Sequence, residues 1–583
     1  MSLRVMQSDI SRLEPGEKRL LSKLRSLYST IEYIAYLDIQ PLIRQLNPDF
    51  ILIDPYKGVC IIEIKDWSLE FLESMNQTTV KDIKGHEYYN PVYRARQYFN
   101  ALKDLLEREP YLLNEDKRLR FRLYSKVVFP NISSSEIEAL KDVLHQPVTD
   151  CISSDQFASL SVNTFFGHDS IYLDQKTVSM IRGKIFPEIR IKDVQSEIWQ
   201  FNRLKSIDNK FIATLDHEQE KFARKVPEGH YMVTGVPGSG KTIILLARAI
   251  HLLRENPDWK VLILTYNRSL RKKIKNQIEA KREDLSYMGA SYENLKVLTF
   301  HSLAEEVAEC WYSSAQGEDF WKLIPYLALD KAKPIYDAIL IDEYQDFENI
   351  WFKLCLKICI QHKDKNGNLT ENIFLAGDRL QSIYNPKVHV WKDIGINIVG
   401  HSKLLKTSYR SGGSHIEMAL NYLMLDDELR REVENFYEGR EGICQNFESE
   451  GTVNFFTGDH KQINSVLLDL LKSGYNPGDI IVLGPSKSGN EYLYQRLDES
   501  LKRVSVVSKE IDNNKLIITT YHSSKGLENK VCILLNVDQL DNRKLIYVGL
   551  TRASEKLYIH SYSPGKVFKE LLSCYKNDDN NPV

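Results

Sequence analysis

Gly235-Val-Pro-Gly-Ser-Gly-Lys-Thr242 matches the phosphate-binding pattern G-x-x-x-x-G-K-[ST] at every defined position. The octapeptide lies between the apolar run 231–234 and the apolar segment 243–250, which are a predicted strand and a predicted helix. In this arrangement backbone N–H groups and a helix N-terminus surround a phosphate. We therefore expect a site for ATP or GTP, in which Lys241 contacts the β- and γ-phosphates and Thr242 binds Mg²⁺. The expected lining residues are Gly235, Pro237, Gly238, Ser239, Gly240, Lys241 and Thr242.

From about residue 211 onward, short apolar runs alternate with segments of helical pattern. This alternation is typical of parallel α/β sheets, and the number of runs favours two sheets in succession, divided near residues 385–400. The runs are YMVTGV (231–236), VLILTY (261–266), AILIDE (338–343), NIFLAGD (372–378), DIIVLG (479–484), KLIITT (515–520) and VCILLNV (531–537).

The third of these runs ends in two acidic residues, Asp342 and Glu343, about a hundred residues after the phosphate loop. An acid at the end of a strand beside such a loop can hold Mg²⁺, and the next carboxylate can activate the attacking water. A solvated loop is the alternative for paired acids at a strand end. The apolar run and the phosphate loop together favour a metal-binding Asp342 and a catalytic Glu343.

Residues 215–560 resemble a superfamily 1 helicase of the UvrD/Rep type, because eight short motifs stand in the order of that family. The resemblance implies two RecA-like parallel-sheet domains. The motifs are LDHEQ (215–219), TYN (265–267), TFHS (299–302), DEYQD (342–346), GDRLQSIY (377–384), TSYRS (407–411), TTYHSSKGLE (519–528) and YVGLTRA (547–553).

This resemblance assigns roles to single residues. It implies that Gln219 reads adenine, that Glu528 contacts the nucleotide and that Gln381 belongs to the motif that couples the two sheets. It also implies that Arg410 and Arg552 are arginine fingers, which touch the γ-phosphate only when the sheets close on ATP. An arginine supplied in this way can be worth roughly 10³–10⁵ in rate. A surface salt bridge is the alternative for a single arginine.

A strand of nucleic acid would be held by base stacking, which is worth about 1–3 kcal/mol per base, and by phosphate contacts. Phe300, Tyr384 and Tyr266 are aromatic residues in strand-contacting motifs, and a place in the core is the alternative for each. Asn267, His301 and His522 are expected to contact the backbone or to take part in coupling.

Segment 268–282 holds seven basic residues against one acidic residue. Leu270, Ile274 and Ile278 form an apolar stripe at helical spacing, so basic side chains remain for phosphate contacts. A merely solvated face explains the pattern almost equally well. The basic side chains concerned are Arg271, Lys272 and Lys275.

The chain departs from full-size UvrD-like enzymes in its spacing. Only 31 residues separate Asn267 from Thr299, and 107 separate Ser411 from Thr519, where those enzymes carry large inserted subdomains. We therefore expect a core with reduced insertions. Opening duplex costs about 1.4 kcal/mol per stacked step, so translocation without strand separation is an alternative to unwinding.

A second candidate site lies in residues 47–65. The turn sequence Asp54-Pro-Tyr-Lys-Gly58 joins two β-rich runs and predicts a hairpin. With the turn centred on Tyr56, Asp49 falls opposite Glu63, and Lys65 shares their face. Two carboxylates and a lysine on one face can hold a hard cation and orient a water. Asp54 would instead cap the turn.

The arrangement Pro-Asp followed by Glu-x-Lys resembles restriction-type nucleases, and more narrowly the nuclease-related (NERD) domain, over roughly residues 11–130. The resemblance implies that Asp49 and Glu63 bind Mg²⁺ and that Lys65 aids the nucleophilic water. It implies a further acid or ligand in Glu17 and a weaker positioning role for Gln97, within NPVYRARQYFNAL. An amphipathic hairpin with charged surface residues, or a domain that binds without cutting, is the alternative.

The composition of the 583 residues limits the class of protein. With 43% hydrophobic and 27% charged residues, it excludes a disordered or disulfide-stapled chain. A net charge of −2 provides no general attraction for nucleic acid, so binding requires a local groove. The eight cysteines include no CxxC pair, which argues against a zinc ribbon or an iron–sulfur cluster. No signal segment is visible and no apolar run approaches the about 20 residues that span a bilayer, so we expect a cytoplasmic protein.

The sequence thus predicts an α/β protein with a restriction-nuclease-like domain before two RecA-like domains. We expect an ATP-dependent DNA translocase or helicase coupled to a Mg²⁺-dependent nuclease, acting on single-stranded or partly duplex DNA in anti-phage defence or repair. An ATP-gated binding module that cuts nothing and an RNA-directed helicase are the alternatives. The expected divisions are a nuclease-type domain (1–180), a connector (181–210), a first RecA-like domain (211–390), a second (391–575) and a polar tail (576–583).

Overall fold

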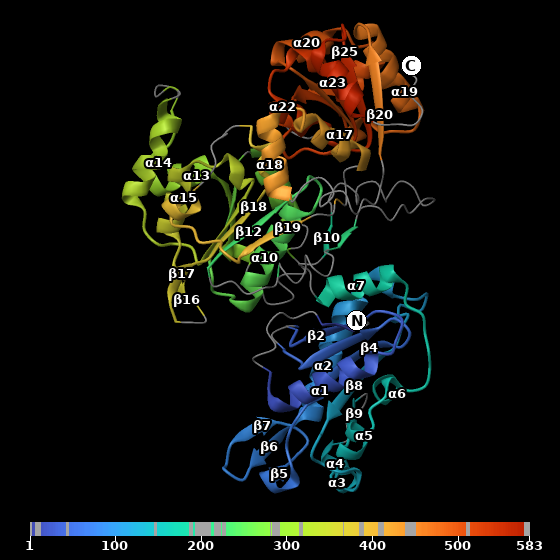
Figure 1. The fold of residues 1–583 in the computed structure, drawn as a ribbon. Helices are drawn as coiled ribbons and strands as arrows, with labels where there is room; N and C mark the ends of the chain where they lie inside the picture. The colour runs from blue at the N-terminus through green and yellow to red at the C-terminus, as the bar shows by residue number, and fades with distance from the viewer. Residues whose placement is uncertain are drawn as a thin grey trace. The chain divides into compact units, whose positions relative to one another are not determined.

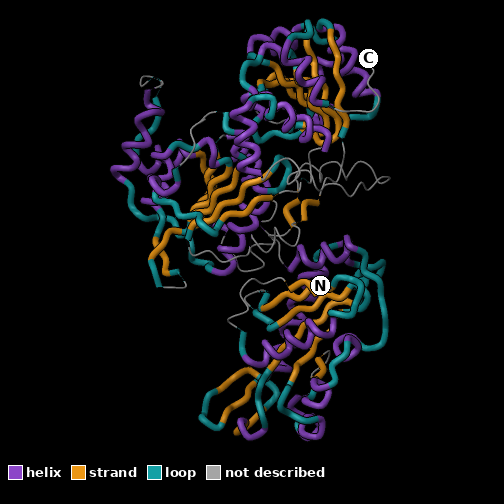
Figure 2. Tube along the Cα trace, viewed as in Figure 1, coloured by secondary structure: helices purple, strands orange, loops and turns teal. Residues whose placement is uncertain are grey.

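The protein is a mixed α/β chain, and its described residues form three six-stranded sheets besides smaller ones (Figures 1 and 2). It divides into two compact units, of which the first is residues 1–226 with 246–258 and 277–294 and the second is the remainder. The computed structural model describes residues 3–5, 13–41, 43, 46–144, 149–185, 190–192, 212–214, 223, 229–266, 268–279, 282, 292–313, 317, 319–364, 367–383, 390–405, 408, 413–437, 451–508 and 514–575.

The sheet of the first unit has the strand order β1-β2-β3-β4-β8-β9. Strands β2, β3 and β4 are antiparallel neighbours, and β8 and β9 follow β4 in parallel. Every residue of β4 is buried, as expected for a strand with neighbours on both sides. The strands are β1 (Leu3–Val5), β2 (Ala35–Ile39), β3 (Phe50–Asp54), β4 (Gly58–Ile64), β8 (Leu123–Val128) and β9 (Thr149–Ile152).

Side chains of β4 alternate between the two faces of the sheet. Cys60, Ile62 and Ile64 pack with apolar residues of helix α1 (Pro15–Tyr28). Helix α2 (Pro91–Glu107) contributes to a different cluster, with residues of β8 and the segment after it. Glu63 alternates with Ile62 and Ile64 and therefore belongs to the other face of the strand.

Smaller elements complete the first unit. An antiparallel sheet of β5 (Leu72–Met75), β6 (Thr79–Asp82) and β7 (Glu87–Tyr89) immediately precedes α2, and it lies at the lower end of this unit in Figure 1. The remaining elements are α3 (Ser134–Ala139), α4 (Lys141–Leu144), α5 (Ser154–Ala158), α6 (Val162–Phe166), α7 (Gln175–Ile185) and the antiparallel pair β10 (Arg190–Lys192) and β11 (Ile212–Thr214).

The second sheet is wholly parallel, with the order β14-β13-β15-β18-β12-β19. Its strands are β12 (His230–Gly235), β13 (Val261–Thr265), β14 (Leu295–Thr299), β15 (Ala338–Asp342), β18 (Ile373–Gly377) and β19 (Ser402–Leu405). The connecting elements are α10 (Lys241–Glu255), α11 (Arg268–Glu279), α13 (Phe300–Ala308), α14 (Asp319–Lys331), α15 (Asn349–Ile358), α16 (Trp391–Ile394) and the hairpin of β16 (Gln361–Lys363) and β17 (Leu369–Glu371).

Strand β19 lies beyond the boundary near residue 390 that the sequence predicted for this domain. It pairs in parallel with β12, the strand that leads into the phosphate loop. The four residues Ser402–Leu405 include a serine and a lysine and give no clear strand pattern, so only the pairing reveals them as part of the first RecA-like sheet.

The third sheet is also wholly parallel, with the order β20-β25-β24-β21-β23-β22. Its strands are β20 (Thr452–Thr457), β21 (Ile480–Gly484), β22 (Ser505–Val507), β23 (Leu516–Thr520), β24 (Asn529–Leu534) and β25 (Ala553–Ser561). The helices are α17 (Gly413–Leu423), α18 (Asp427–Tyr437), α19 (His460–Lys472), α20 (Lys487–Gln495), α21 (Glu499–Val504), α22 (Arg543–Leu550) and α23 (Lys566–Cys574).

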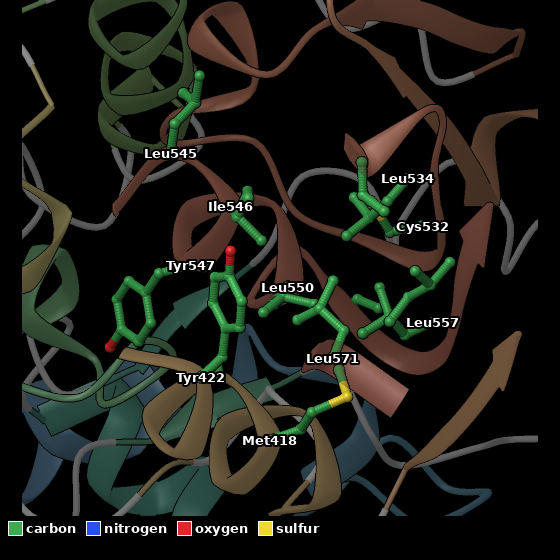
Figure 3. Packing of buried hydrophobic residues seen from close by; sticks show 14 of the residues in the cluster. Met418, Tyr422, Cys532, Leu534, Leu545, Ile546, Tyr547, Leu550, Leu557 and Leu571 are labelled. Atoms are coloured by element: carbon green, nitrogen blue, oxygen red, sulfur yellow. The ribbon is translucent and has the colours of Figure 1, made fainter. Parts of the chain in front are cut away.

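Helices α17, α22 and α23 pack against one face of the third sheet. Figure 3 shows Tyr422, Ile546 and Leu571 of these helices gathered with Leu534 and Leu557 of the strands. A separate cluster includes residues of α19, α20 and α21 and covers the other face. Both parallel sheets thus have the buried strands and flanking helices that the sequence predicted. In the described part of the chain, no helix is long and apolar enough to cross a membrane.

Candidate functional site

The phosphate loop connects the end of β12 to the start of α10. Gly238 and Gly240 have φ angles of 71° and 85°, in the left-handed region that glycine adopts readily. Lys241 folds back over the loop, where its Nζ donates to the carbonyl oxygens of Gly235 (3.0 Å) and Val236 (2.9 Å). The loop therefore has a curled backbone suited to a phosphate, with the lysine ammonium held against it.

Other predicted residues of this loop are tightly packed. Ser239 is fully buried, and the carbonyl of Pro237 accepts a hydrogen bond from Oγ of Ser408 at 3.0 Å. Ser408 belongs to the TSYRS motif, so this motif reaches the phosphate loop. A Cβ on Gly235 would lie 2.6 Å from the carbonyl oxygen of Leu405, so β19 leaves no room for a larger residue there.

The two expected Mg²⁺ residues lie side by side. Oγ1 of Thr242 donates to Oδ2 of Asp342 at 2.9 Å, and Asp342 is only 1% exposed. Burial, followed by the charge of Glu343, raises the pKa of Asp342 to about 7. A carboxyl group with this pKa gains from a nearby cation, because positive charge stabilises its ionised form.

Glu343, the expected base, has a left-handed backbone with φ 56°, which is uncommon for a residue other than glycine. Its carboxylate accepts a hydrogen bond from the Gln345 side chain. Its Oε2 also lies 3.7 Å from Nζ of Lys525. The carboxylate at the end of β15 is thus positioned from two directions.

Lys525 is a residue that the sequence reasoning did not single out. It is 2% exposed, and its Nζ binds Oδ2 of Asp346 and the carbonyl of Gln381, each at 2.5 Å. A buried ammonium of this kind requires such partners, because its desolvation is costly. The only sequence signal for a role of Lys525 was its position within TTYHSSKGLE. Its partners are distant in the sequence, so only the fold identifies them.

Gln381 and Arg552, two predicted catalytic residues, are in direct contact. Nη2 of Arg552 donates to Oε1 of Gln381 at 3.0 Å, and the amide of Gln381 donates to Oδ2 of Asp378 at 3.1 Å. The other guanidinium nitrogens bind the carbonyls of Val548 and Leu527. Arg552 is 3% exposed, so the alternative of a surface salt bridge does not apply to it. Glu528, the predicted nucleotide contact, follows Leu527 and is partly buried.

The expectations for base stacking need a correction. Phe300 is fully buried, with its ring stacked on Trp351 at 4.1 Å, so it belongs to the core and the prediction that it stacks on bases is wrong. Tyr266 is partly buried and also packs on Trp351. The ring of His301 meets Trp351 and Trp321 edge-on, and burial lowers its pKa.

The predictions for Gln219, Asn267, Tyr384 and Arg410 lie outside the described residues.

The basic segment forms helix α11 as predicted. Leu270, Ile274 and Ile278 are buried along one stripe, which confirms the packed face. Of the three basic residues predicted to contact phosphate, Lys272 and Lys275 are exposed and Arg271 is partly exposed. His522, which was predicted to contact the backbone or take part in coupling, is also exposed.

The N-terminal hairpin has the register that the sequence predicted. The ladder pairs Asp54 with Gly58 and continues to Phe50 with Ile62, so Asp49 and Glu63 are next in line. Oδ2 of Asp49 accepts from the backbone N–H of Ile64 at 2.8 Å.

Lys65 lies against both carboxylates of this hairpin. Its Nζ is 2.8 Å from Oε1 of Glu63 and 3.8 Å from Oδ2 of Asp49. Burial, and next the charge of Glu63, raise the pKa of Asp49 to about 6. Although burial lowers the pKa of Lys65, Glu63 and Asp49 raise it above its usual value. The lysine is therefore a stable cation at the carboxylate pair.

Glu17 joins this group from helix α1. It is 4% exposed, and its carboxylate accepts from the backbone N–H of Glu14 (2.7 Å) and from Nε2 of Gln40 (3.0 Å). Burial is the main cause that raises its pKa, and the charge of Asp49 adds to it. Glu17 in turn opposes the rise in the pKa of Asp49, so the two carboxyl groups influence each other's ionisation.

The carboxylate pair fits a Mg²⁺ ion. Mg²⁺ is usually bound through one or two carboxylates, with water in the other positions. Oε2 of Glu63 is buried and has no hydrogen-bond partner among the described residues, so this oxygen remains for a cation. A larger cluster of His, Cys, Asp or Glu able to hold a metal is absent from the described part of the chain.

Asp54 lies apart from this pair and has a structural role. It is fully buried, and its carboxylate accepts from the hydroxyls of Tyr28 (2.7 Å) and Tyr33 (3.0 Å) and from the backbone N–H of Tyr56 (2.8 Å). The last bond is the predicted turn cap. The two tyrosine contacts were not foreseen, because they depend on helix α1 and the segment after it.

Helix α2 contributes two residues that the sequence reasoning missed. Tyr98 is 4% exposed, and burial, with the nearby charge of Glu63, raises its pKa to about 12. Arg94, one turn earlier, lies with its guanidinium carbon 5.7 Å from the ring centroid of Tyr98 and donates to Oε1 of Gln97 at 3.3 Å. The predicted positioning residue Gln97 thus contacts Arg94. The spacing of four residues on one helix face was the available signal.

Three family models match the chain. The nuclease-related domain (NERD) matches residues 12–130, the UvrD/REP helicase N-terminal domain matches residues 215–324 and 327–387, and the UvrD-like helicase C-terminal domain matches residues 515–560. In their order along the chain, these matches correspond to a fusion of a NERD domain with a UvrD-like helicase.

Individual proteins resemble parts of this chain. The ATP-dependent DNA helicase srs2 of Schizosaccharomyces pombe is 34% identical over 99 residues, which span 15% of this chain and 11% of that helicase. The crystal structure of the Arterivirus nonstructural protein 10 helicase has a TM-score of 0.30 at 14% identity, covering 63% of this chain and 68% of that one. The PRRSV helicase has a TM-score of 0.29 at 14% identity, covering 60% and 57%.

Proposed function

We propose that this fusion of a nuclease-related domain with a UvrD-like helicase core is an ATP-dependent DNA translocase or helicase that also cuts DNA with the aid of Mg²⁺. The observation that carries the proposal is the buried contact between Gln381 and Arg552. It links the coupling segment after β18 to the arginine of the second RecA-like domain. Such a link makes closure of the two domains and hydrolysis of ATP depend on each other.

The residues of the ATP site would divide the work as follows. Lys241 holds the β- and γ-phosphates, and Thr242 with Asp342 holds Mg²⁺, which supplies positive charge to the phosphates. Glu343 accepts a proton from the attacking water. Arg552 stabilises the negative charge of the transition state.

The residues of the nuclease site would act in a similar order. Asp49 and Glu63 hold Mg²⁺, which supplies a Lewis acid and lowers the pKa of a bound water. Lys65, positioned by Glu63, orients the nucleophile, and Glu17 serves as a further acid beside Asp49. The proposed partner is single-stranded or partly duplex DNA.

The domain limits that we propose follow the three sheets. The nuclease-type domain comprises residues 1–180 and the connector 181–210. The first RecA-like domain begins at residue 211 and includes β19, and the second continues to residue 575, followed by a polar tail. A nuclease directed by a motor suits DNA repair or the destruction of invading phage DNA.

The function can be tested by incubating the full chain with Mg²⁺ and end-labelled single-stranded DNA or RNA, with and without ATP. We expect DNA-stimulated ATP hydrolysis and Mg²⁺-dependent cleavage of DNA. ATP hydrolysis without cleavage would favour a binding module whose nuclease-related domain only grips DNA. Stronger stimulation by RNA than by DNA would assign the motor to RNA.

A further inference from the structure

A group of aromatic side chains begins two residues after Lys65. The ring of Trp67 lies 6.0 Å from that of Phe71 and 5.9 Å from that of Tyr88, measured between centroids. Tyr88 is 40% exposed, and the adjacent Tyr89 is 57% exposed. We call Trp67, Phe71 and Tyr88 the aromatic platform. Tyr89, the next residue of β7, lies on the other face of that strand. Exposed aromatic side chains gathered at one place are a common feature of binding surfaces.

Arg94 of helix α2 lies between an exposed and a buried tyrosine. Its guanidinium carbon lies 4.7 Å from the ring centroid of exposed Tyr89 and 5.7 Å from that of buried Tyr98. Helix α2 packs against β4, the strand that carries Glu63, and Trp67 packs against the hydrophobic cluster to which α2 contributes. Arg94 and the platform therefore both border the helix that covers the strand of the predicted metal ligands.

The charge of Arg94 is not neutralised by an acidic side chain within the described residues. Other cations near the site are paired: Arg19 with Asp66, and Lys65 with Glu63. Arg94 is partly buried, donates to the neutral amide of Gln97 and lies over the rings of Tyr89 and Tyr98. A planar guanidinium in this state is well suited to bind a phosphate through two hydrogen bonds.

We propose that Arg94 binds a phosphate of the DNA strand beside the bond to be cut, and that the aromatic platform stacks on the bases of the same strand. The inference rests on the proposed nuclease function and adds the substrate surface of that site. Stacking on open rings requires unpaired bases, so the substrate is single-stranded or has a frayed end. The nuclease-related domain would therefore select a single strand by itself, independently of the helicase core.

Two measurements on the full chain test the proposal. The first is photo-crosslinking of single-stranded DNA that carries 5-iodouracil, followed by mass spectrometry of the peptides. We expect crosslinks at Trp67, Phe71 or Tyr88. The second is the salt dependence of KM for Mg²⁺-dependent cleavage, compared between the wild type and Arg94→Ala. Loss of one phosphate contact on a single strand should lower the slope of log KM against log salt by about 0.7.

Matched variants control for folding and for charge. Arg94→Ala and Tyr88→Ala should each raise KM by roughly tenfold, with kcat little changed, because each removes one substrate contact. Lys103→Ala removes a cation from the far end of the same helix, where Lys103 pairs with Glu107, and should leave KM unchanged. DNA-stimulated ATP hydrolysis should be the same in all three variants.

The outcomes separate this proposal from the nuclease function itself. Crosslinks on the platform in a protein that never cuts would support the binding surface and refute the nuclease assignment. Cleavage with an unchanged KM in Arg94→Ala, together with no crosslinks at residues 67–89, would refute the surface and leave the nuclease assignment intact. Preferential crosslinking of a competing RNA strand would refute the choice of DNA.

Discussion

Nη2 of Arg552 donates a hydrogen bond to Oε1 of Gln381 over 3.0 Å, across the two RecA-like domains. Lys525 makes a second such link, because its ammonium binds Asp346 and the carbonyl of the same Gln381. Both basic residues belong to the second domain, and their partners follow strands β15 and β18 of the first. The end of the first sheet that carries the phosphate loop is thus in contact with two buried cations.

Arg552→Ala should reduce DNA-stimulated ATP hydrolysis by roughly 10³-fold or more, because it removes a transition-state charge. ATP binding, measured by titration with a fluorescent analogue, should change much less. The control Arg496→Ala removes an exposed arginine of the same domain that packs on Tyr492 and should retain activity. Loss of nucleotide binding in Arg552→Ala would contradict the role of an arginine finger.

Lys525→Met should lower the free energy of unfolding by about 3–5 kcal/mol, because it leaves the buried carboxylate of Asp346 without its cation. Denaturant titration followed by tryptophan fluorescence measures the effect. Lys530→Met provides a control, since the side chain of Lys530 is 32% exposed in its ion pair with Asp479. Equal stability of the two variants would show that the Lys525 pair adds nothing to the link between the domains.

Asp49→Ala, Glu63→Ala and Lys65→Ala should each remove Mg²⁺-dependent cleavage and leave ATP hydrolysis intact. Asp54→Ala should cut DNA at a near-normal rate but lose about 1.5–3 kcal/mol of stability, because the hydroxyls of Tyr28 and Tyr33 lose their acceptor. Cleavage assays with thermal melting distinguish the two effects. A folded Asp54→Ala without nuclease activity would overturn this division of roles.

The stability of the second RecA-like domain should fall with acid, in part through His560. This residue is fully buried, its Nε2 binds the carbonyl of Gly458, and burial lowers its pKa. The unfolded chain protonates its histidines near about pH 6.5, so below that pH it binds more protons than the folded chain and unfolding becomes easier.

His560→Asn should therefore reduce the loss of melting temperature between about pH 7 and pH 5. His522→Asn, at an exposed position of the same domain, is the control and should keep the wild-type slope. If His560→Asn kept that slope as well, the buried imidazole would not contribute to acid sensitivity.

Much of the ATP site could be predicted because its residues lie at the ends of strands. Thr242 and Asp342 are a hundred positions apart, yet their strands belong to one parallel sheet, whose carboxyl ends meet at the same edge. The hairpin register was also predictable, since the turn residues 54–58 determine which side chains face one another.

Other features depend on packing that a local pattern does not encode. An aromatic residue at the start of a helix suits a DNA contact or the core equally well, and only the stack on Trp351 places Phe300 in the core. Similarly, β19 is recognised by its partner β12, and the ion pair of Lys525 joins residues 179 positions apart. The contacts of Arg94 and Tyr98 could be predicted only with knowledge of how α2 packs against the sheet.

The most direct test of the account is the rate of ATP hydrolysis with Mg²⁺, measured with increasing single-stranded DNA for the wild type, Lys241→Ala and Glu343→Gln. We predict stimulation of the wild type that fades with salt, because the contacts with phosphate release counterions. We also predict no hydrolysis by Lys241→Ala, and nucleotide binding without hydrolysis by Glu343→Gln. Near-normal turnover in Lys241→Ala, or a wild-type rate that DNA leaves unchanged, would contradict it.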